Sequence, residues 1–138
     1  MMTGRDACEV SIDSENEMIS VRKVIRNVAT EMGFGVTDVT RIVTAASELT
    51  RNIFLYASSG TMIWRTCEVN GNTGIELIFE DHGPGIADIE EAMQAGFTTG
   101  GGLGLGLPGT KRLMDDMEIK SQKGEGTVIT IRKYLRRC

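Results

Sequence analysis

Hydrophobic residues near the amino terminus recur first at every second position and then at every third or fourth. The alternation over residues 7–12 is typical of a short, half-buried strand, which we expect at an edge of a sheet. The helical spacing that follows predicts an amphipathic helix with a capping-box pattern over residues 14–17 and an end at Gly33. A second helix is predicted from an N-cap at Thr37 to about Tyr56.

The second predicted helix carries two polar residues beside its hydrophobic stripe. At roughly 100° per residue, the stripe is made by the side chains of Val39, Ile42, Ala46, Leu49 and Ile53. Glu48 and Asn52 lie one turn apart on another face, centred roughly 110° from the stripe. The pattern therefore places a carboxylate and an amide together on a flank that borders the core.

The second half of the chain alternates strand patterns with glycine-rich segments. Four strands are predicted in two hairpins, over residues 61–69, 74–80, 118–122 and 127–134. A turn at Asn70, Gly71 and Asn72 joins the first pair. We also expect a short helix over residues 88–94 and another with Pro108 in its first turn. This order predicts an α/β fold, an α+β sandwich in which helices cover one face of a mixed, mostly antiparallel sheet.

Composition narrows the classes of protein to which the chain can belong. A chain of 138 residues with 41% hydrophobic residues predicts a single domain, 1–138, with one buried core. The formal net charge of -4 argues against a nucleic-acid partner, because phosphate contacts need clustered Lys and Arg. The basic group at residues 132–137 is interpreted as a solvated tail or strand edge, with a docking patch as the alternative.

Cysteine usage and hydropathy predict the cellular compartment. The three cysteines form no Cys-x-x-Cys pair, which fits a reducing compartment without a disulfide framework or zinc site. The amino terminus has no hydrophobic segment typical of a signal peptide, and no stretch approaches about 18 apolar residues. We therefore expect a cytoplasmic protein with no membrane partner.

Glycine is concentrated in one part of the chain. Of the 17 glycines, nine fall between Gly83 and Gly109. Glycines that lead into a helix N-terminus can present backbone N–H groups to a polyphosphate, and we interpret this segment as such a site. The alternative interpretation is a flexible linker. The run ends in Gly-Thr-Lys rather than the Gly-Lys-Ser/Thr of a P-loop. The Gly-x-Gly-x-x-Gly match at residues 104–109 lacks the strand and downstream units of a dinucleotide-binding fold. A eukaryotic-type kinase would need His-Arg-Asp and Asp-Phe-Gly motifs, which the sequence does not contain.

Four motifs in a fixed order carry a resemblance to a known superfamily. They are Glu48 with Asn52 on a helix, Asp81-x-Gly83-x-Gly85 after a strand, the series Gly102, Leu103, Gly104, Leu105 and Gly106, and Gly126-Thr127 at a strand start. This set resembles the N, G1, G2 and G3 boxes of the GHKL superfamily, the Bergerat-fold ATPases. The resemblance implies an ATP-binding domain with a lid over about residues 86–106.

A narrower resemblance extends over nearly the whole chain. Residues 47–53, 80–86 and 101–115 are similar to the stressosome switch serine/threonine kinases of the RsbT type, relatives of anti-sigma-factor kinases. The resemblance implies an ATP-dependent kinase that phosphorylates Ser or Thr in STAS-domain partners and switches partners in a stress response. It also implies a PP2C-type phosphatase or a sigma factor as a further partner. The alternative is a nucleotide-controlled anti-sigma factor or binding module with little catalysis.

The resemblance also assigns roles around the adenine base and the phosphates. Asp81 at a strand end is expected to accept the exocyclic amine of adenine, with Thr127 close to the base through water. Gly83 and Gly85 let the backbone approach the base and hinge the lid. The glycine series 102–106 is expected to close over the nucleotide and cradle its phosphates.

The polar pair of the second helix is expected to carry the chemistry. Mg²⁺ prefers oxygen ligands and keeps several waters, so the Asn52 amide oxygen and ATP phosphates make a sufficient site. Glu48 is placed to accept the proton of an attacking hydroxyl or to orient that hydroxyl, with a salt bridge to Arg41 or Arg51 as the alternative. Lys111 is a candidate phosphate contact from its helix, with a solvated face as the alternative.

Overall fold

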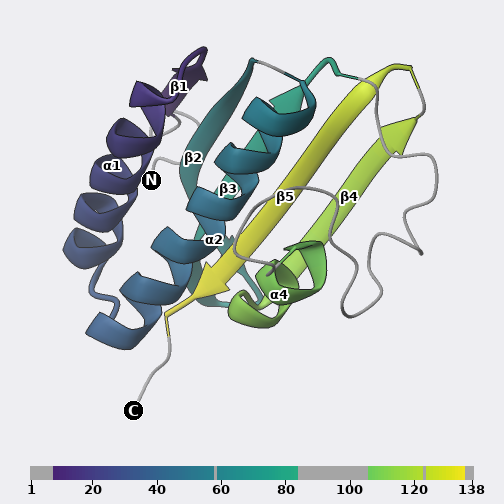
Figure 1. Ribbon diagram of the computed structural model, residues 1–138. Helices are drawn as coiled ribbons and strands as arrows, with labels where there is room; N and C mark the ends of the chain where they lie inside the picture. The colour runs from purple at the N-terminus through teal and green to yellow at the C-terminus, as the bar shows by residue number, and fades with distance from the viewer. Residues whose placement is uncertain (1–7, 58, 84–105, 123, 136–138) are drawn as a thin grey trace.

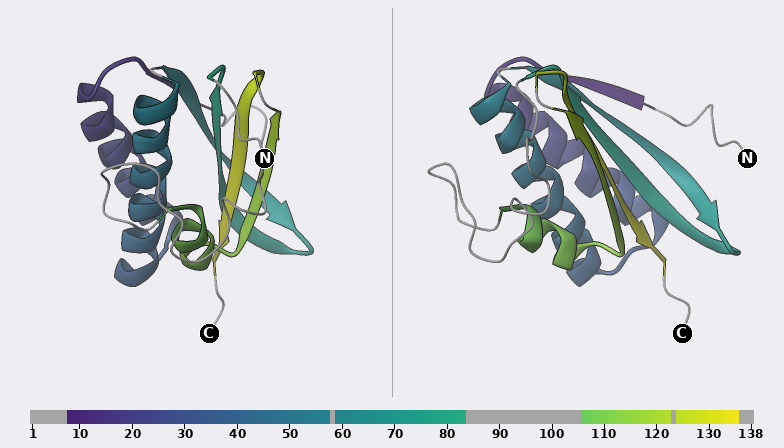
Figure 2. Two further views of the ribbon diagram at one scale, coloured as in Figure 1. Left: turned by 45° about the vertical axis from the view of Figure 1, so that its right-hand side comes forward. Right: turned by 90° about the vertical axis from the view of Figure 1, so that its right-hand side faces the viewer.

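The computed structural model places one layer of helices against one sheet (Figure 1) and describes residues 8–57, 59–83, 106–122 and 124–135. In chain order the elements are β1 (Cys8–Ile12), α1 (Asn16–Met32), α2 (Val36–Tyr56), β2 (Gly60–Val69), β3 (Asn72–Asp81), α4 (Gly106–Leu113), β4 (Asp116–Gln122) and β5 (Gly126–Tyr134). The five strands are ordered β1-β2-β3-β5-β4, and every neighbouring pair is antiparallel. Figure 2 shows the helices on one face of the sheet. The predicted α+β sandwich and its edge strand are therefore confirmed, with a sheet that is antiparallel throughout its described part.

The core lies between α2 and the face of the sheet that the helices cover. The predicted stripe of α2 is confirmed, because all five of its side chains are at most 8% exposed. Alternate residues of β3 and β5 face it, namely Ile75, Leu77, Phe79, Ile129 and Ile131. The helix α1 adds Val21, Ile25 and Ala29 beside them. Burial along its whole length fixes α2 on the sheet, and with it the polar flank that holds Glu48 and Asn52.

Left-handed backbone residues make the first hairpin turn and end α1, both as predicted. Asn70 and Gly71 have φ of 53° and 82°, and they join the opposed residues Val69 and Asn72. Two positive φ values in a two-residue loop are what a twisted hairpin requires, which explains the Asn-Gly sequence. Gly33, with φ of 104°, ends α1.

The start of α2 differs from the prediction. Its N-cap is Gly35, and the helix begins at Val36, so Thr37 already lies inside it and the predicted cap is wrong. The physical reason is the short link: only two residues separate the left-handed Gly33 from the helix, and the first of them, Phe34, is buried. Tertiary packing of Phe34 therefore sets the start of the helix ahead of the capping preference of threonine.

Helix α1 begins one residue later than a capping box over residues 14–17 would place it, and the side-chain hydrogen bond of such a cap is absent. The N-cap residue Glu15 makes no side-chain cap bond. The hydroxyl of Ser14 instead donates to the Glu17 carboxylate at 3.1 Å, while the Glu17 N–H donates to the Ser14 carbonyl at 3.1 Å. The serine and glutamate therefore pair with each other at the helix start.

The face of the sheet opposite the helices carries a network of ion pairs. Glu76 is only 3% exposed, and its carboxylate accepts hydrogen bonds from Arg65 and, at 2.6 Å, from Arg132 on the two neighbouring strands. The Tyr134 hydroxyl donates to Asp116 at 2.6 Å, and this hydrogen bond raises the pKa of Tyr134 to about 12. The buried carboxylate is therefore satisfied by its own strands without a covering helix.

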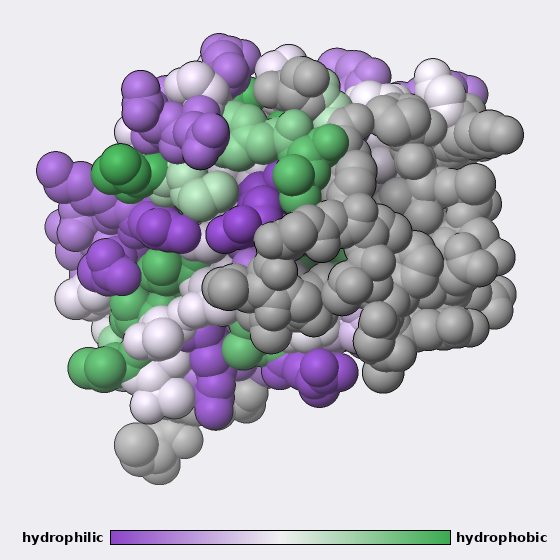
Figure 3. All heavy atoms as spheres, in the orientation of Figure 1, coloured by the Kyte–Doolittle hydropathy of each residue, from purple (hydrophilic) through white to green (hydrophobic). Residues whose placement is uncertain are grey.

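The outer surface of the helix layer mixes both kinds of side chain. Figure 3 shows hydrophobic side chains scattered among hydrophilic ones on this face. Among the described residues, the large exposed hydrophobic side chains lie on helices α1 and α2 and at the end of strand β2, and they are Ile19, Val36, Leu55 and Val69. None of the helices in the described part of the chain combines the length and the hydrophobicity of a membrane span.

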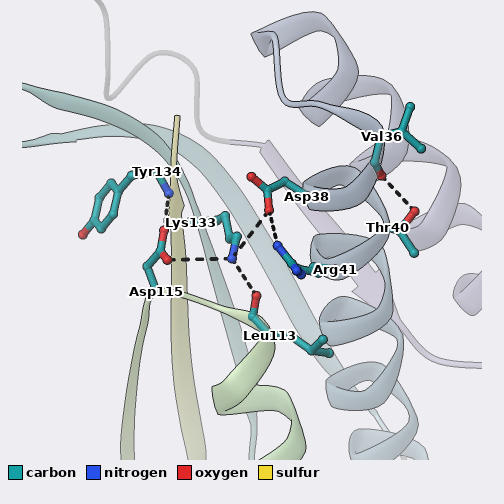
Figure 4. Close-up of polar contacts among 8 residues, drawn as sticks. All are labelled: Val36, Asp38, Thr40, Arg41, Leu113, Asp115, Lys133 and Tyr134. Atoms are coloured by element: carbon teal, nitrogen blue, oxygen red, sulfur yellow. Dashed lines mark hydrogen bonds and ion pairs between the residues drawn. The ribbon is translucent and has the colours of Figure 1, made fainter. Parts of the chain in front are cut away.

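A buried lysine holds the C-terminal end of α4 (Figure 4). Lys133 of β5 is 4% exposed, and its Nζ donates to the Leu113 carbonyl at 2.9 Å. The same Nζ lies 3.7 Å from an Asp115 carboxylate oxygen and 3.8 Å from one of Asp38, which also pairs with Arg41 at 3.0 Å. One ammonium group thus links α4, α2 and β5. The interpretation of this lysine as part of a solvated basic group is wrong, because the tertiary fold covers it.

Replacing Lys133 with methionine should lower the free energy of unfolding by about 2–4 kcal/mol, because two carboxylates and a carbonyl lose their shared partner. Denaturant unfolding at neutral pH measures this change. The matched control is Lys120→Met, since Lys120 is exposed on β4 and its replacement should cost under about 0.5 kcal/mol. Equal losses in the two variants would show that the buried lysine does not hold the three elements together.

Candidate active site

The candidate site lies where a row of opposed residues crosses one end of the sheet. In register across four strands are Gly60 of β2, Asp81 of β3, Thr127 of β5 and Ser121 of β4. Directly opposed residues of antiparallel strands project to the same face. This is the face that the helices cover, because the alternate core residues of β3 and β5 also lie on it. The row therefore brings two predicted site residues, Asp81 and Thr127, side by side.

One oxygen of the Asp81 carboxylate accepts a hydrogen bond within the turn that follows β3. Its Oδ1 accepts the Gly83 N–H at 2.9 Å, which fixes the side chain at the end of β3. Asp81 is half-buried, and no other described residue hydrogen-bonds to its carboxylate. A carboxylate has about four lone-pair sites, so Asp81 keeps acceptor capacity for a ligand.

Glycines on both neighbouring strands allow close backbone approach around Asp81. A Cβ at Gly126, whose φ is 98°, would lie 2.2 Å from the Asp81 carbonyl oxygen. A Cβ at Gly60 would lie 2.4 Å from the Glu80 carbonyl oxygen and 3.2 Å from the Ile53 side chain. Both positions therefore require glycine. The contact with Ile53 also shows that the second half of α2 lies against the row that holds Asp81.

Glu48 is buried on α2 without a charged partner. Its side chain is 7% exposed, and among the described residues none forms a hydrogen bond or ion pair with it. Arg41 pairs with Asp38 instead, and the buried Nε of Arg51 has no hydrogen-bond partner. The salt bridge that was the alternative for Glu48 is therefore not formed. Asn52 follows one helical turn later and is half-buried.

The remaining predicted site residues fall into two groups. Lys111 is exposed on α4, in agreement with the solvated face, and Gly106 is the first residue of that helix. Residues 84–105 lie outside the described part of the chain. This range contains the predicted helix 88–94, nearly all of the predicted lid, and the site residues Gly85, Gly102, Leu103, Gly104 and Leu105.

Two features of the site were not predicted from the sequence. Ser121 hydrogen-bonds to the site residue Thr127, and Gly126 is needed for close approach to Asp81 as well as for its turn. The tight turn between β4 and β5 was visible in the sequence. The register of the two strands, which places Ser121 opposite Thr127, could not be predicted from the sequence.

The structure thus combines a helix-covered antiparallel sheet with polar residues at the ends of β3 and β5 on the covered face. Residues 12–133 match the family described as histidine kinase-like ATPase domain, and the chain belongs to this family. The match covers all the described elements except part of β1 and the last residue of β5.

Individual relatives narrow the comparison. The chain is 50% identical over 127 residues to the serine/threonine-protein kinase RsbT of Bacillus subtilis (strain 168), which covers 92% of this chain and 96% of that protein. It is 36% identical over 98 residues to an anti-sigma F factor of Heyndrickxia coagulans, covering 67% of each. A solved structure of the RsbU and RsbW domains of Rv1364c from Mycobacterium tuberculosis matches with a TM-score of 0.62 and 21% identity, over 96% of this chain and 33% of that chain. This last likeness shows the fold alone. The chain is thus a homologue of a serine/threonine-protein kinase and of anti-sigma factors, which confirms the resemblance.

Proposed function

We propose that the chain is an ATP-dependent protein kinase that phosphorylates Ser or Thr in a STAS-domain partner. The observation that carries the proposal is the buried Glu48, which has no partner among the described residues and lies one turn before Asn52. A carboxylate that makes no structural ion pair or hydrogen bond with the described residues is free to act on a bound ligand, which supports a role in chemistry. The 50% identity to a protein named a serine/threonine-protein kinase supports the same conclusion.

The nucleotide is proposed to extend from the end of the sheet toward α2 and α4. The adenine base would lie against Asp81 and Thr127, the opposed acceptors on β3 and β5. Its phosphates would lie toward Asn52 and toward the N-terminal end of α4, which begins at Gly106. Backbone N–H groups at a helix N-terminus favour negative charge, so this direction places the phosphates at a favourable end.

Asn52 is the proposed protein ligand of Mg²⁺. Its amide is half-buried on α2 and makes no hydrogen bond to any described residue, so its oxygen is available. An amide oxygen suits this hard cation, which usually takes its other ligands from phosphates and water. The bound ion would neutralise charge that develops on the phosphates during transfer.

Glu48 is proposed as the general base. Its carboxylate would accept the proton of the partner's hydroxyl as that oxygen attacks the γ-phosphorus. The bond from the γ-phosphorus to the bridging β,γ-oxygen breaks, and ADP leaves with both electrons of that bond. The products are the phosphorylated Ser or Thr, ADP and a protonated Glu48, which releases its proton to solvent. A positioned base of this kind contributes about 10²–10⁴-fold to the rate.

Partner switching in the cytoplasm completes the proposal. Phosphorylation adds about two negative charges to the STAS partner, which alters its fit to the kinase surface and releases the kinase to a second protein. A PP2C-type phosphatase or a sigma factor is the proposed second partner. The 36% identity to an anti-sigma F factor supports the alternative in which binding, rather than catalysis, is the main activity.

Incubation with labelled ATP, Mg²⁺ and STAS proteins encoded nearby tests the proposed function. We expect label on one Ser or Thr of a partner, located by mass spectrometry, and no label when Mg²⁺ is chelated. Absence of label with every partner, together with tight binding to a sigma factor, would contradict the kinase and support the anti-sigma alternative.

A further inference from the structure

Two hydroxyl groups at the end of the sheet form a directed hydrogen-bond chain. Ser121 Oγ donates to the Gly126 carbonyl oxygen at 2.9 Å. Ser121 Oγ and Thr127 Oγ1 lie 2.8 Å apart across the β4 and β5 strands. Both hydrogen bonds join residues of the hairpin that β4 and β5 form, so the pairing of these two strands holds the two hydroxyl groups in place.

The first of these hydrogen bonds decides the direction of the second. A serine hydroxyl carries a single hydrogen, and Ser121 gives it to a carbonyl oxygen that can only accept. In the contact with Thr127, the hydrogen must therefore come from the threonine. Because a threonine hydroxyl also has one hydrogen, Thr127 Oγ1 has only lone pairs to offer to a ligand.

The neighbour of Thr127 in the row is also an acceptor. Asp81 is directly opposed to Thr127, and an ionised carboxylate only accepts hydrogen bonds. A water that bridges the two would give one hydrogen to each and would turn only its lone pairs to the ligand. The site thus presents acceptors to the base either directly or through one water.

We propose that Ser121 is a specificity-determining residue, which holds Thr127 as an acceptor and so selects purines with an amino group at position 6. An amino group at that position donates a hydrogen bond to Thr127 or to its water. A 6-oxo group can only accept hydrogen bonds, so it would face Thr127 or the water without a hydrogen between them. Ser121 does not touch the nucleotide and acts through Thr127. The inference rests on the proposed function, because it needs the base to lie against Asp81 and Thr127.

Competition between ATP and inosine triphosphate, which has oxygen at position 6, tests the inference. The ratio of the two dissociation constants is measured for the full chain and for Ser121→Ala. Without Ser121, the Thr127 hydroxyl rotates and can donate, so the preference for ATP should fall by about 5- to 30-fold. Ser121→Thr keeps a hydroxyl and should restore the preference. Ser11→Ala, which removes an exposed strand serine, is the matched control and should keep the parent ratio.

A second variant separates the role of Ser121 from a loss of structure. Thr127→Val removes the acceptor itself, so its preference should also fall, and adding Ser121→Ala to it should change the ratio no further. An unchanged ratio in Ser121→Ala would overturn the inference while leaving the proposed function intact. Failure of the parent chain to bind ATP at all would instead overturn the proposed function, and the inference with it.

Discussion

Replacing Glu48 with glutamine is expected to slow phosphoryl transfer by about 10²–10⁴-fold while leaving ATP affinity within about threefold of the parent value. Glutamine keeps the size and polarity of the side chain but cannot accept the proton of the attacking hydroxyl. Because Glu48 pairs with no described residue, its replacement removes no structural ion pair. Single-turnover transfer to a STAS partner gives the rate, and nucleotide titration gives the affinity.

The matched control for this substitution is Glu31→Gln. Glu31 is exposed on α1 and lies in a different helix from the proposed site, so its replacement should leave both rate and affinity near the parent values. If Glu48→Gln phosphorylates a partner at the parent rate, Glu48 is not the base. A variant that loses affinity and rate together would instead assign Glu48 to nucleotide binding.

The second large effect is expected at Asp81. Replacing it with asparagine should weaken ATP binding by about 10- to 100-fold, because hydrogen bonds to charged groups are the stronger ones and an amide can turn donors to the base. The Gly83 N–H can still find an oxygen in asparagine, so the turn at the end of β3 should persist. Titration calorimetry with ATP and Mg²⁺ measures the change.

Asp13→Asn serves as the control for Asp81→Asn. Asp13 is exposed ahead of α1, so the same chemical change there should leave the dissociation constant unaltered. Thermal unfolding of both variants checks that each remains folded. Parent-like ATP affinity in Asp81→Asn would remove Asp81 from the adenine site.

Local signals in the sequence were sufficient for most of the fold. The spacing of Ile42, Leu49 and Ile53 on α2 matches their burial, because a helix with one apolar stripe has one way to face a sheet. The Asn70-Gly71 turn was equally readable, since few other residue pairs adopt two positive φ values. Periodicity and turn chemistry act over a few residues, so they can be interpreted without tertiary structure.

Contacts between distant segments could not be predicted in the same way. Lys133 follows the same strand pattern as its neighbours in the sequence. Its ion pairs with Asp38 and Asp115, which lie on other segments, form only when the tertiary structure brings the three residues together. Helix α2 starts at Val36 rather than after Thr37 because Phe34 is packed in the core, and the sequence near the helix start does not indicate this packing. Within the candidate site, the residue types of Asp81 and Thr127 were predicted, but the hydroxyl of Ser121 needed the strand register.

A crystal structure of the chain with a non-hydrolysable ATP analogue and Mg²⁺ tests the central claim most directly, namely that α2, β3 and β5 form one nucleotide site. We expect the 6-amino group of adenine within hydrogen-bond reach of Asp81, Thr127 or a water between them, and Mg²⁺ on the Asn52 amide oxygen. A base bound away from Asp81, or phosphates turned away from Asn52, would contradict the account.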